Sequence, residues 1–189
     1  RSDSLIAIQP LYFVTSWYDL SGHMRDFGAV VMGQTIPSLT PDAINGYPAV
    51  TFTDQGGVGG DFLGYNGSLG ITGADAATVV IVARNTTSAD EQNGGLYMGQ
   101  KNAGGVNAVR SYGLEYADAV RFNGQNQVFN DGHTAGDWKI IYYTNSAGAS
   151  VSGYSAFLNG SALTGSSSST FVPSLVSNFA LVGATQMNG

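Results

Sequence analysis

Thr78-Val79-Val80-Ile81-Val82-Ala83-Arg84 is the most informative stretch of this sequence. It is an almost continuous run of apolar, mostly β-branched residues. Strands that are buried on both faces have this character, because neither face carries a regular polar position. The stretch therefore predicts a central strand that is covered on both of its faces.

Short apolar runs bounded by Gly, Asn and Asp recur along the rest of the chain, and helical periodicity is nearly absent. This pattern is typical of an antiparallel sandwich. One run alternates, with Ile140 and Tyr142 on one face and Ile141 and Tyr143 on the other. The predicted strands are Leu5–Ile8, Tyr12–Trp17, Ala29–Met32, Ala49–Phe52, Phe62–Tyr65, Thr78–Arg84, Gly95–Gln100, Val106–Tyr112, Ala119–Phe122, Trp138–Thr144, Tyr154–Leu158 and Phe179–Val182.

The predicted core follows from these apolar patterns. We expect Trp138 to be an anchor of the core, and Asn159-Gly160 to form a type I′ hairpin turn between two short strands. The other residues expected to be mostly buried are Trp17, Phe52, Val80, Val82, Ile140 and Tyr142.

The composition of the chain excludes several classes of function. The chain has 189 residues, of which 11% are charged, and a net charge of −6 with seven Lys and Arg. Phosphate neutralisation needs a basic surface, so nucleic acid is excluded as an expected partner. No apolar run is long enough for membrane insertion, and the absence of cysteine rules out disulfides and thiolate chemistry.

Four segments, taken in order, resemble successive motifs of bacterial laminin-G-like (concanavalin-A-like) domains. They are Ser16-Trp17-Tyr18-Asp19-Leu20-Ser21-Gly22, Gly46-Tyr47-Pro48-Ala49-Val50-Thr51-Phe52, Thr78–Arg84 and Tyr154–Gly160. The resemblance spans nearly the whole chain. It implies an all-β fold, an antiparallel two-sheet jelly-roll sandwich, with residues 1–189 forming a single domain.

The resemblance also implies a further strand after Leu181-Val182-Gly183-Ala184, whereas the sequence ends at Gly189. Phe179, Leu181 and Val182 are apolar enough to lie beside a partner strand. Two sources of the further strand stay open. Either a neighbouring subunit supplies it, so that the chain self-assembles by β-strand pairing, or downstream residues of the same chain do.

Glycoside hydrolysis on this fold needs a pair of carboxyl groups that flank the bond, whereas a polysaccharide lyase needs a Tyr or His base. Glu115 and Asp118 are the best candidate pair, but their spacing of three places them on opposite faces of a regular strand. His23 and His133 lie in loop-like segments. Solvated carboxylates and histidines are therefore the expectation, and no catalytic residue is predicted.

Calcium is the metal that the sequence favours, because calcium takes oxygen ligands from Asp, Asn and backbone carbonyls. None of the Asp-bearing loops matches an EF-hand, so turn-forming roles are the alternative for every one of them. The candidate ligands are Asp54, Asp61, Asp75, Asp131 and Asp137.

Sugars bind to exposed aromatic rings on sandwich surfaces, and the candidates here are Tyr65, Tyr97, Tyr112 and Tyr116. We expect an extracellular or cell-surface, non-catalytic module for adhesion, matrix or subunit assembly, whose partner is a glycan or a protein. The alternative is a secreted polysaccharide-degrading enzyme, a glycoside hydrolase or a lyase, on the same fold.

Overall fold

The computed structural model describes residues 6–8, 12–29, 35–53, 61–84, 93–99, 110–114, 119–122, 125–129, 136–175 and 178–183. Its regular structure is almost all strand. The elements are β1 (Ile6–Ile8), β2 (Val14–Trp17), β3 (Phe27–Ala29), β4 (Ser38–Ile44), β5 (Tyr47–Thr51), β6 (Leu63–Tyr65), β7 (Ala77–Ala83), β8 (Asn93–Gly99), β9 (Arg110–Leu114), β10 (Ala119–Phe122), β11 (Gln125–Val128), β12 (Lys139–Asn145), the 3₁₀ turn η2 (Val151–Gly153), β13 (Ser155–Leu158), β14 (Ser161–Ala162) and β15 (Phe179–Val182).

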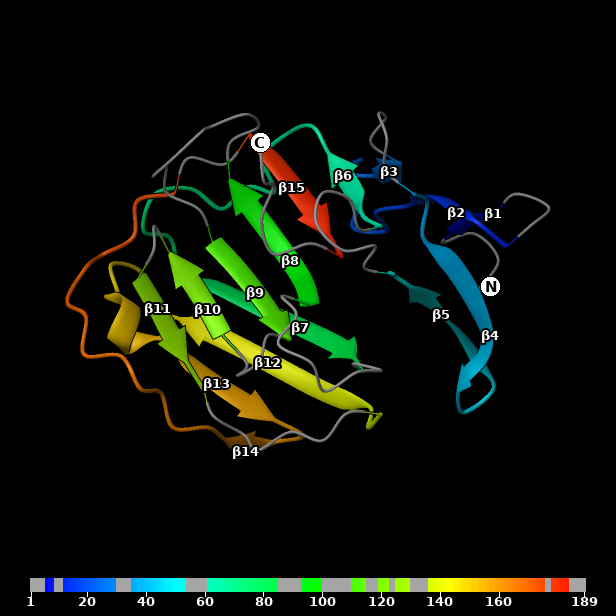
Figure 1. Ribbon diagram of the computed structural model, residues 1–189. Helices are drawn as coiled ribbons and strands as arrows, with labels where there is room; N and C mark the ends of the chain where they lie inside the picture. The colour runs from blue at the N-terminus through cyan, green and yellow to red at the C-terminus, as the bar shows by residue number, and fades with distance from the viewer. Residues whose placement is uncertain are drawn as a thin grey trace.

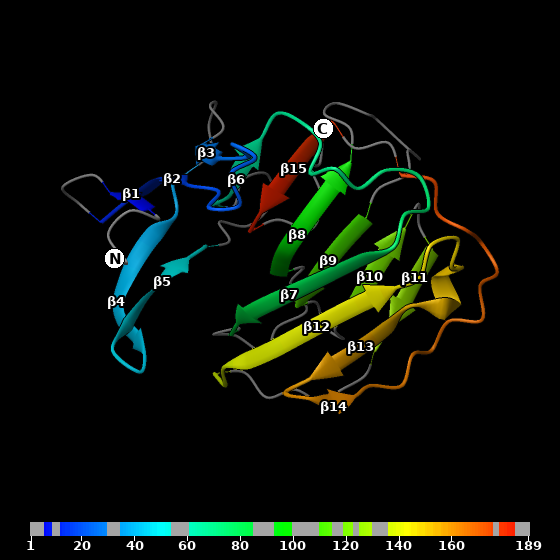
Figure 2. The ribbon, with the colours of Figure 1, turned by 180° about the vertical axis from the view of Figure 1, so that it is seen from behind.

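The strands form an antiparallel β-sandwich, which confirms the predicted fold class. A nine-stranded sheet, here called the large sheet, has the order β1-β2-β3-β6-β15-β8-β9-β10-β11. A four-stranded sheet, the small sheet, has the order β14-β13-β12-β7 and lies against it (Figure 1; Figure 2 shows the small sheet in front). β4 and β5 form a separate hairpin at one side of the sandwich (Figure 1). Within the described ranges, no helix has both the length and the apolar character that a membrane span requires.

Two hairpins turn on Asn-Gly pairs. Asn159 and Gly160 have φ of 48° and 88°, between Leu158 and Ser161, which pair across β13 and β14. Asn45-Gly46 has the same positive φ angles between β4 and β5. Two positive φ values in succession define the type I′ turn that matches strand twist, so the turn predicted at Asn159-Gly160 is confirmed.

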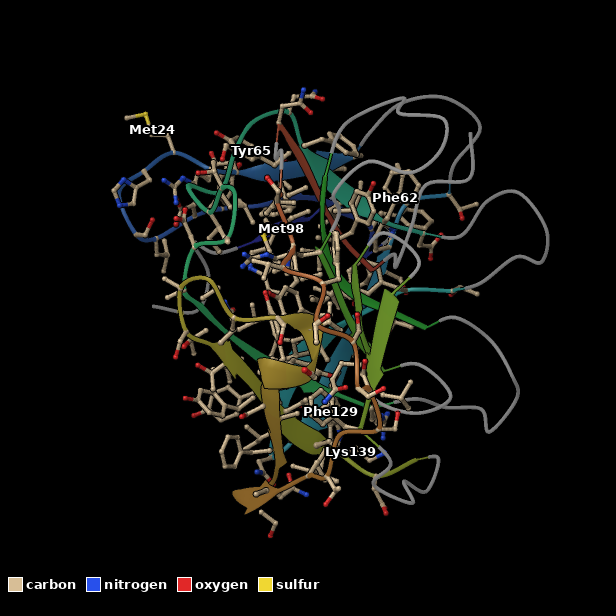
Figure 3. All side chains as sticks on the ribbon, turned by 90° about the vertical axis from the view of Figure 1, so that its left-hand side faces the viewer. Met24, Phe62, Tyr65, Met98, Phe129 and Lys139 are labelled. Atoms are coloured by element: carbon tan, nitrogen blue, oxygen red, sulfur yellow. The ribbon has the colours of Figure 1, made fainter. Side chains whose placement is uncertain are left out.

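The hydrophobic core lies between the two sheets. From β12, Ile141 and Tyr143 point into this layer and are completely buried. They meet Met98 of β8 and Phe129, which Figure 3 shows with the sheets seen edge-on. The Tyr143 ring lies 6.2 Å from that of Phe129. The predicted alternation along β12 is therefore confirmed.

The prediction from the sequence of which face of β7 and β12 is buried was wrong. Val80, Val82 and Ile140 are 60%, 56% and 53% exposed, because they lie on the outer face of the small sheet, where none of the described strands covers them. β7 is an edge strand of that sheet, not a central strand covered on both faces. Trp17 is 37% exposed, and the remaining predicted core residues are only half-buried: Phe52, Trp138 and Tyr142.

A polar group of residues sits inside the core. Arg110 of β9 is fully buried, and its Nη2 donates hydrogen bonds to the carbonyls of Gly73 and Asp75, at 3.2 and 3.1 Å. Asn145 Nδ2 donates to the same Asp75 carbonyl at 3.0 Å. Burial raises the pKa of the Tyr154 phenol beside Arg110, so this hydroxyl stays protonated. These bonds fix the connection before β7 to both sheets.

Strand β15 is paired with a strand of the same chain on each of its two sides. It lies inside the large sheet, where Leu181 pairs with Gly64 of β6 on one side and with Tyr97 of β8 on the other. The expectation that Phe179, Leu181 and Val182 lie along an open edge is therefore wrong. Among the described strands, β7 is the long apolar one that ends a sheet.

Candidate functional site

The outer face of the large sheet, which is turned away from the small sheet, is the candidate site. Met98 and Ala180 belong to the core between the sheets. Successive side chains of a strand point to opposite faces of the sheet. Tyr97, next to Met98, and Leu181, next to Ala180, are therefore on the outer face. One row of paired positions on this face crosses every strand of the large sheet: Ala7, Ser16, Gly28, Gly64, Leu181, Tyr97, Ser111, Arg121 and Asn126.

The row changes character from one end to the other. Its positions on β9, β10 and β11 are polar, namely Ser111, Arg121 and Asn126. Its positions on β3 and β6 are Gly28 and Gly64, the smallest that a strand can offer. Hydroxyl, guanidinium and amide groups together can donate to and accept from sugar hydroxyls. The residue types at these three paired positions are therefore ones that polar ligand sites use.

An apolar cluster lies beside this polar part. Phe179, Leu181 and Tyr97 are buried, and Phe62 packs against them. Burial raises the pKa of the Tyr97 phenol. Because the Tyr97 ring is only 6% exposed, it does not present an open face on which a sugar could stack. The cluster supports the sheet rather than forming a binding platform.

The other three tyrosine candidates for sugar binding are not grouped with Tyr97 in the structure as described. Tyr112 is 1% exposed and lies in the core between the sheets, 5.5 Å from the Tyr143 ring, so it is not a glycan contact. Tyr65 is half-buried, with its ring 6.0 Å from that of Phe27. Figure 3 shows Tyr65 at the end of the sandwich away from Phe129. Tyr116 lies outside the described residues.

Glu115 and Asp118 fall in the connection between β9 and β10, outside the described residues. The prediction that their spacing places them on opposite faces of a strand therefore stays a prediction. Gly113 and Ala119, on either side of the connection, are paired.

Asp61, a calcium candidate, has a structural role. It is buried, and one carboxylate oxygen accepts from the Thr53 N–H at 3.0 Å while the other accepts from the Thr35 hydroxyl. The Asp61 N–H donates to the Thr53 carbonyl, also at 3.0 Å. These bonds join Thr53 and Thr35 to Asp61, and they involve both carboxylate oxygens of Asp61.

Two of the remaining calcium candidates, Asp75 and Asp137, lie in the described residues. Asp75 is exposed, and its Oδ2 accepts from the N–H and hydroxyl of Thr72, as in a turn. Asp137 is exposed just before β12. Asp54 and Asp131 lie outside the described residues. In the ranges that the structure covers, no three His, Cys, Asp or Glu side chains are grouped so as to hold a metal ion.

The segment that resembles the laminin-G-like entry motif is organised by Asp19. Its carboxylate accepts from the N–H and hydroxyl of Ser21, both at 2.7 Å, and from the Arg25 N–H at 3.2 Å. The hydrogen bonds from Ser21 hold the pKa of Asp19 below its usual range. His23 is exposed in the same segment, and His133 lies outside the described residues. Asp19 is therefore a turn-forming residue rather than a proton carrier.

Comparisons with known proteins add information on the fold. No family model matches the chain, and no curated protein resembles its sequence significantly. Several solved structures do resemble its fold, among them the following two. One is a Glu-to-Gln variant of an α-L-arabinofuranosidase of glycoside hydrolase family 54, soaked with 4-nitrophenyl α-L-arabinofuranoside, with a TM-score of 0.58 and 15% sequence identity. The other is a family 54 α-L-arabinofuranosidase soaked with a cyclic sulfate inhibitor, with a TM-score of 0.56 and 15% identity.

The likeness extends over 91% of this chain and 43% of each arabinofuranosidase chain. The chain thus spans less than half the length of these structural neighbours. At this identity the likeness establishes a shared β-sandwich architecture. The structure and the comparisons together define the fold: an antiparallel β-sandwich similar to part of each of these two chains.

Proposed function

We propose that the chain is a carbohydrate-active β-sandwich that hydrolyses glycosides at the outer face of its large sheet, with α-L-arabinofuranosides as the substrate class to test first. The observation that carries the proposal is the likeness to arabinofuranosidases over 91% of the chain. This function corresponds to the alternative that the sequence left open. The likeness supports it better than a purely adhesive role.

The register of the large sheet supports the same assignment. Ser111, Arg121 and Asn126 occupy neighbouring paired positions on β9, β10 and β11. Residues of these types can exchange hydrogen bonds with sugar hydroxyls. In the sequence, Glu115 and Asp118 lie between Gly113 and Ala119, which pair across β9 and β10. The Cα atoms of residues three apart are separated by at most about 11 Å. That limit is compatible with the roughly 5–9.5 Å between carboxyl groups in glycosidases.

Hydrolysis assigns one task to each carboxyl group. One, protonated, donates its proton to the leaving glycosidic oxygen, while the other, ionised, attacks the anomeric carbon or takes a proton from the attacking water. The glycosidic C–O bond breaks, and the leaving group keeps the donated proton. The sugar gains the hydroxyl group of water, and the remaining proton of water restores the acid. We propose Glu115 and Asp118 as this pair.

The test is the release of 4-nitrophenol from 4-nitrophenyl α-L-arabinofuranoside by the wild-type chain and its variants. We expect turnover by the wild type and a loss of about 100-fold or more in kcat for Glu115→Gln and Asp118→Asn, the range typical of a lost acid or base. Glu91→Gln is the matched control, since Glu91 is the other glutamate of the chain and has no proposed role. It should retain the wild-type rate.

Thermal melts of all variants separate lost chemistry from lost folding. Wild-type protein without turnover on arabinofuranosides would contradict the proposal. So would full activity in both the Glu115 and the Asp118 variants.

A second candidate function is a non-catalytic, glycan-binding module outside the cell, as expected from the sequence. One observation favours it: none of the described acidic residues (Asp19, Asp26, Asp42, Asp61, Asp75 and Asp137) belongs to the strands β8–β11 that carry the polar positions. Retention of the wild-type chain on immobilised arabinan, without release of sugar, would favour this module over the hydrolase.

A further inference from the structure

The outer face of the small sheet is apolar and free of charge. It is formed by alternate residues of β7, β12 and β13, and Val80, Val82 and Ile140 are each more than half exposed. These neighbours are in register, because Val82 pairs with Ile140, and Val80 pairs with Tyr142. Lys139 is the one charged residue in the four strands of this sheet, and it is buried on the opposite face. The chain as a whole carries a net charge of −6.

Some polar groups on this face are already hydrogen-bonded within the sheet. The hydroxyls of Thr78 and Thr144 lie 3.3 Å apart across β7 and β12. At the hairpin turn, the Asn159 side-chain oxygen accepts from the Ile140 N–H at 2.9 Å. These groups would keep their partners when the face is covered, so their desolvation would cost little.

The face is also rigid. The rings of Tyr142 and Phe157 pack at a centroid distance of 5.1 Å across β12 and β13. Val80, Val82 and Ile140 are β-branched, so their side chains have little rotamer freedom to lose when they are covered. At the margin, Arg84 lies over the Trp138 ring at 5.0 Å. Branched aliphatic rows of this kind interdigitate with another sheet, as they do inside sandwiches.

We propose that this face is a self-association surface, on which the small sheet of a second copy of the chain packs face to face. Charge argues for a second copy. Two molecules with the same negative charge approach most easily where neither carries a charge, and the strands of this face present none. A two-fold axis would bring identical faces together, as in isologous dimers. The inference does not depend on the proposed hydrolase activity.

The size of the face sets the strength of the dimer. With strand spacing of about 4.8 Å and a rise of about 3.3 Å per residue, the four strands of the small sheet cover about 320 Å². Two copies would bury roughly 640 Å², less than the roughly 1,200 Å² at which stable specific interfaces begin. The dimer is therefore weak and concentration-dependent.

Light scattering or sedimentation over a dilution series tests the proposal. We expect the weight-average mass of the wild-type chain to rise from 19.6 kDa toward twice that value between low micromolar and millimolar concentration. Ile140→Lys places a charge at the centre of the face without touching a sheet edge, and it should leave the chain monomeric throughout. Ile140→Val keeps the face apolar and should associate like the wild type.

Leu20→Lys is the matched control for nonspecific association through exposed apolar side chains. Leu20 is 68% exposed in the connection between β2 and β3, so its variant should dimerise like the wild type. A wild-type chain that stays monomeric at millimolar concentration would overturn the proposal. Association that survives in Ile140→Lys would also overturn it, and would favour pairing through the open edge of β7 instead.

Discussion

Ile141→Ala is expected to lower the free energy of unfolding by about 2–5 kcal/mol, whereas Ile140→Ala should lower it by less than about 1 kcal/mol. The two residues are adjacent in β12 and chemically identical. Ile141 is completely buried between the sheets, while Ile140 is 53% exposed on the outer face of the small sheet. Truncation at Ile141 therefore loses transfer free energy and also leaves a cavity.

Urea denaturation of the two variants, measured below the concentration at which the chain associates, gives this comparison directly. Equal losses at the two positions, or a larger loss at Ile140, would mean that the assignment of the inner and outer faces of β12 is reversed.

Gly95→Ala is expected to destabilise the chain by about 1–3 kcal/mol, an overpacking cost. A Cβ at Gly95 would lie 2.3 Å from the carbonyl oxygen of Tyr112 and 2.8 Å from Cδ1 of Ile81. The first contact is with backbone on the neighbouring strand β9, so it cannot be relieved by a side-chain rotation. The strand itself has to shift, next to the irregular register between Gly94 and Leu96.

Gly28→Ala in β3 is the control for this change. A Cβ there meets only the Thr15 carbonyl oxygen, at 3.9 Å, an ordinary van der Waals distance. Gly28→Ala should leave the melting temperature almost unchanged, while Gly95→Ala should lower it by several degrees. Equal melting temperatures for the two variants would show that β8 and β9 are not packed as closely as described.

Much of the strand pattern was predictable from the sequence. β10 (Ala119–Phe122) and β15 (Phe179–Val182) have the predicted bounds, and β7 is displaced by one residue. β4 was missed because Pro41 and Asp42 disfavour a strand, and the structure accommodates them with an irregular register and a positive φ at Asp42. β11 was missed because Gln125-Asn126-Gln127 lacks apolar alternation.

The faces of the strands were harder to predict than the strands themselves. In β7 and β12 both sets of alternate residues are apolar, so the pattern gives the period but not the side that is buried. The sequence analysis chose Val80, Val82 and Ile140, which the structure leaves exposed. Only the position of the second sheet decides this, and that position is not a local property of the sequence.

The candidate site could not be predicted for a related reason. Its polar row joins Ser111, Arg121 and Asn126 through strand pairing, and one of these strands had not been predicted. The tyrosine candidates were chosen as exposed rings, but Tyr97 and Tyr112 are buried by contacts with distant segments. Each of β9, β10 and β11 has one polar residue in this row, and the next positions on the same face are Gly113, Ala119 and Val128, so no alternating polar pattern marks the row.

The most direct test of the central claim is a map of amide chemical shifts in the chain during titration with an arabinofuranosyl oligosaccharide. We expect the shifts to change at Ser111, Arg121 and Asn126 on the outer face of the large sheet. Amides of the small sheet, such as those of Val80 and Ile140, should not move. Changes confined to the small sheet, or none at millimolar sugar, would contradict the assignment of the glycoside site.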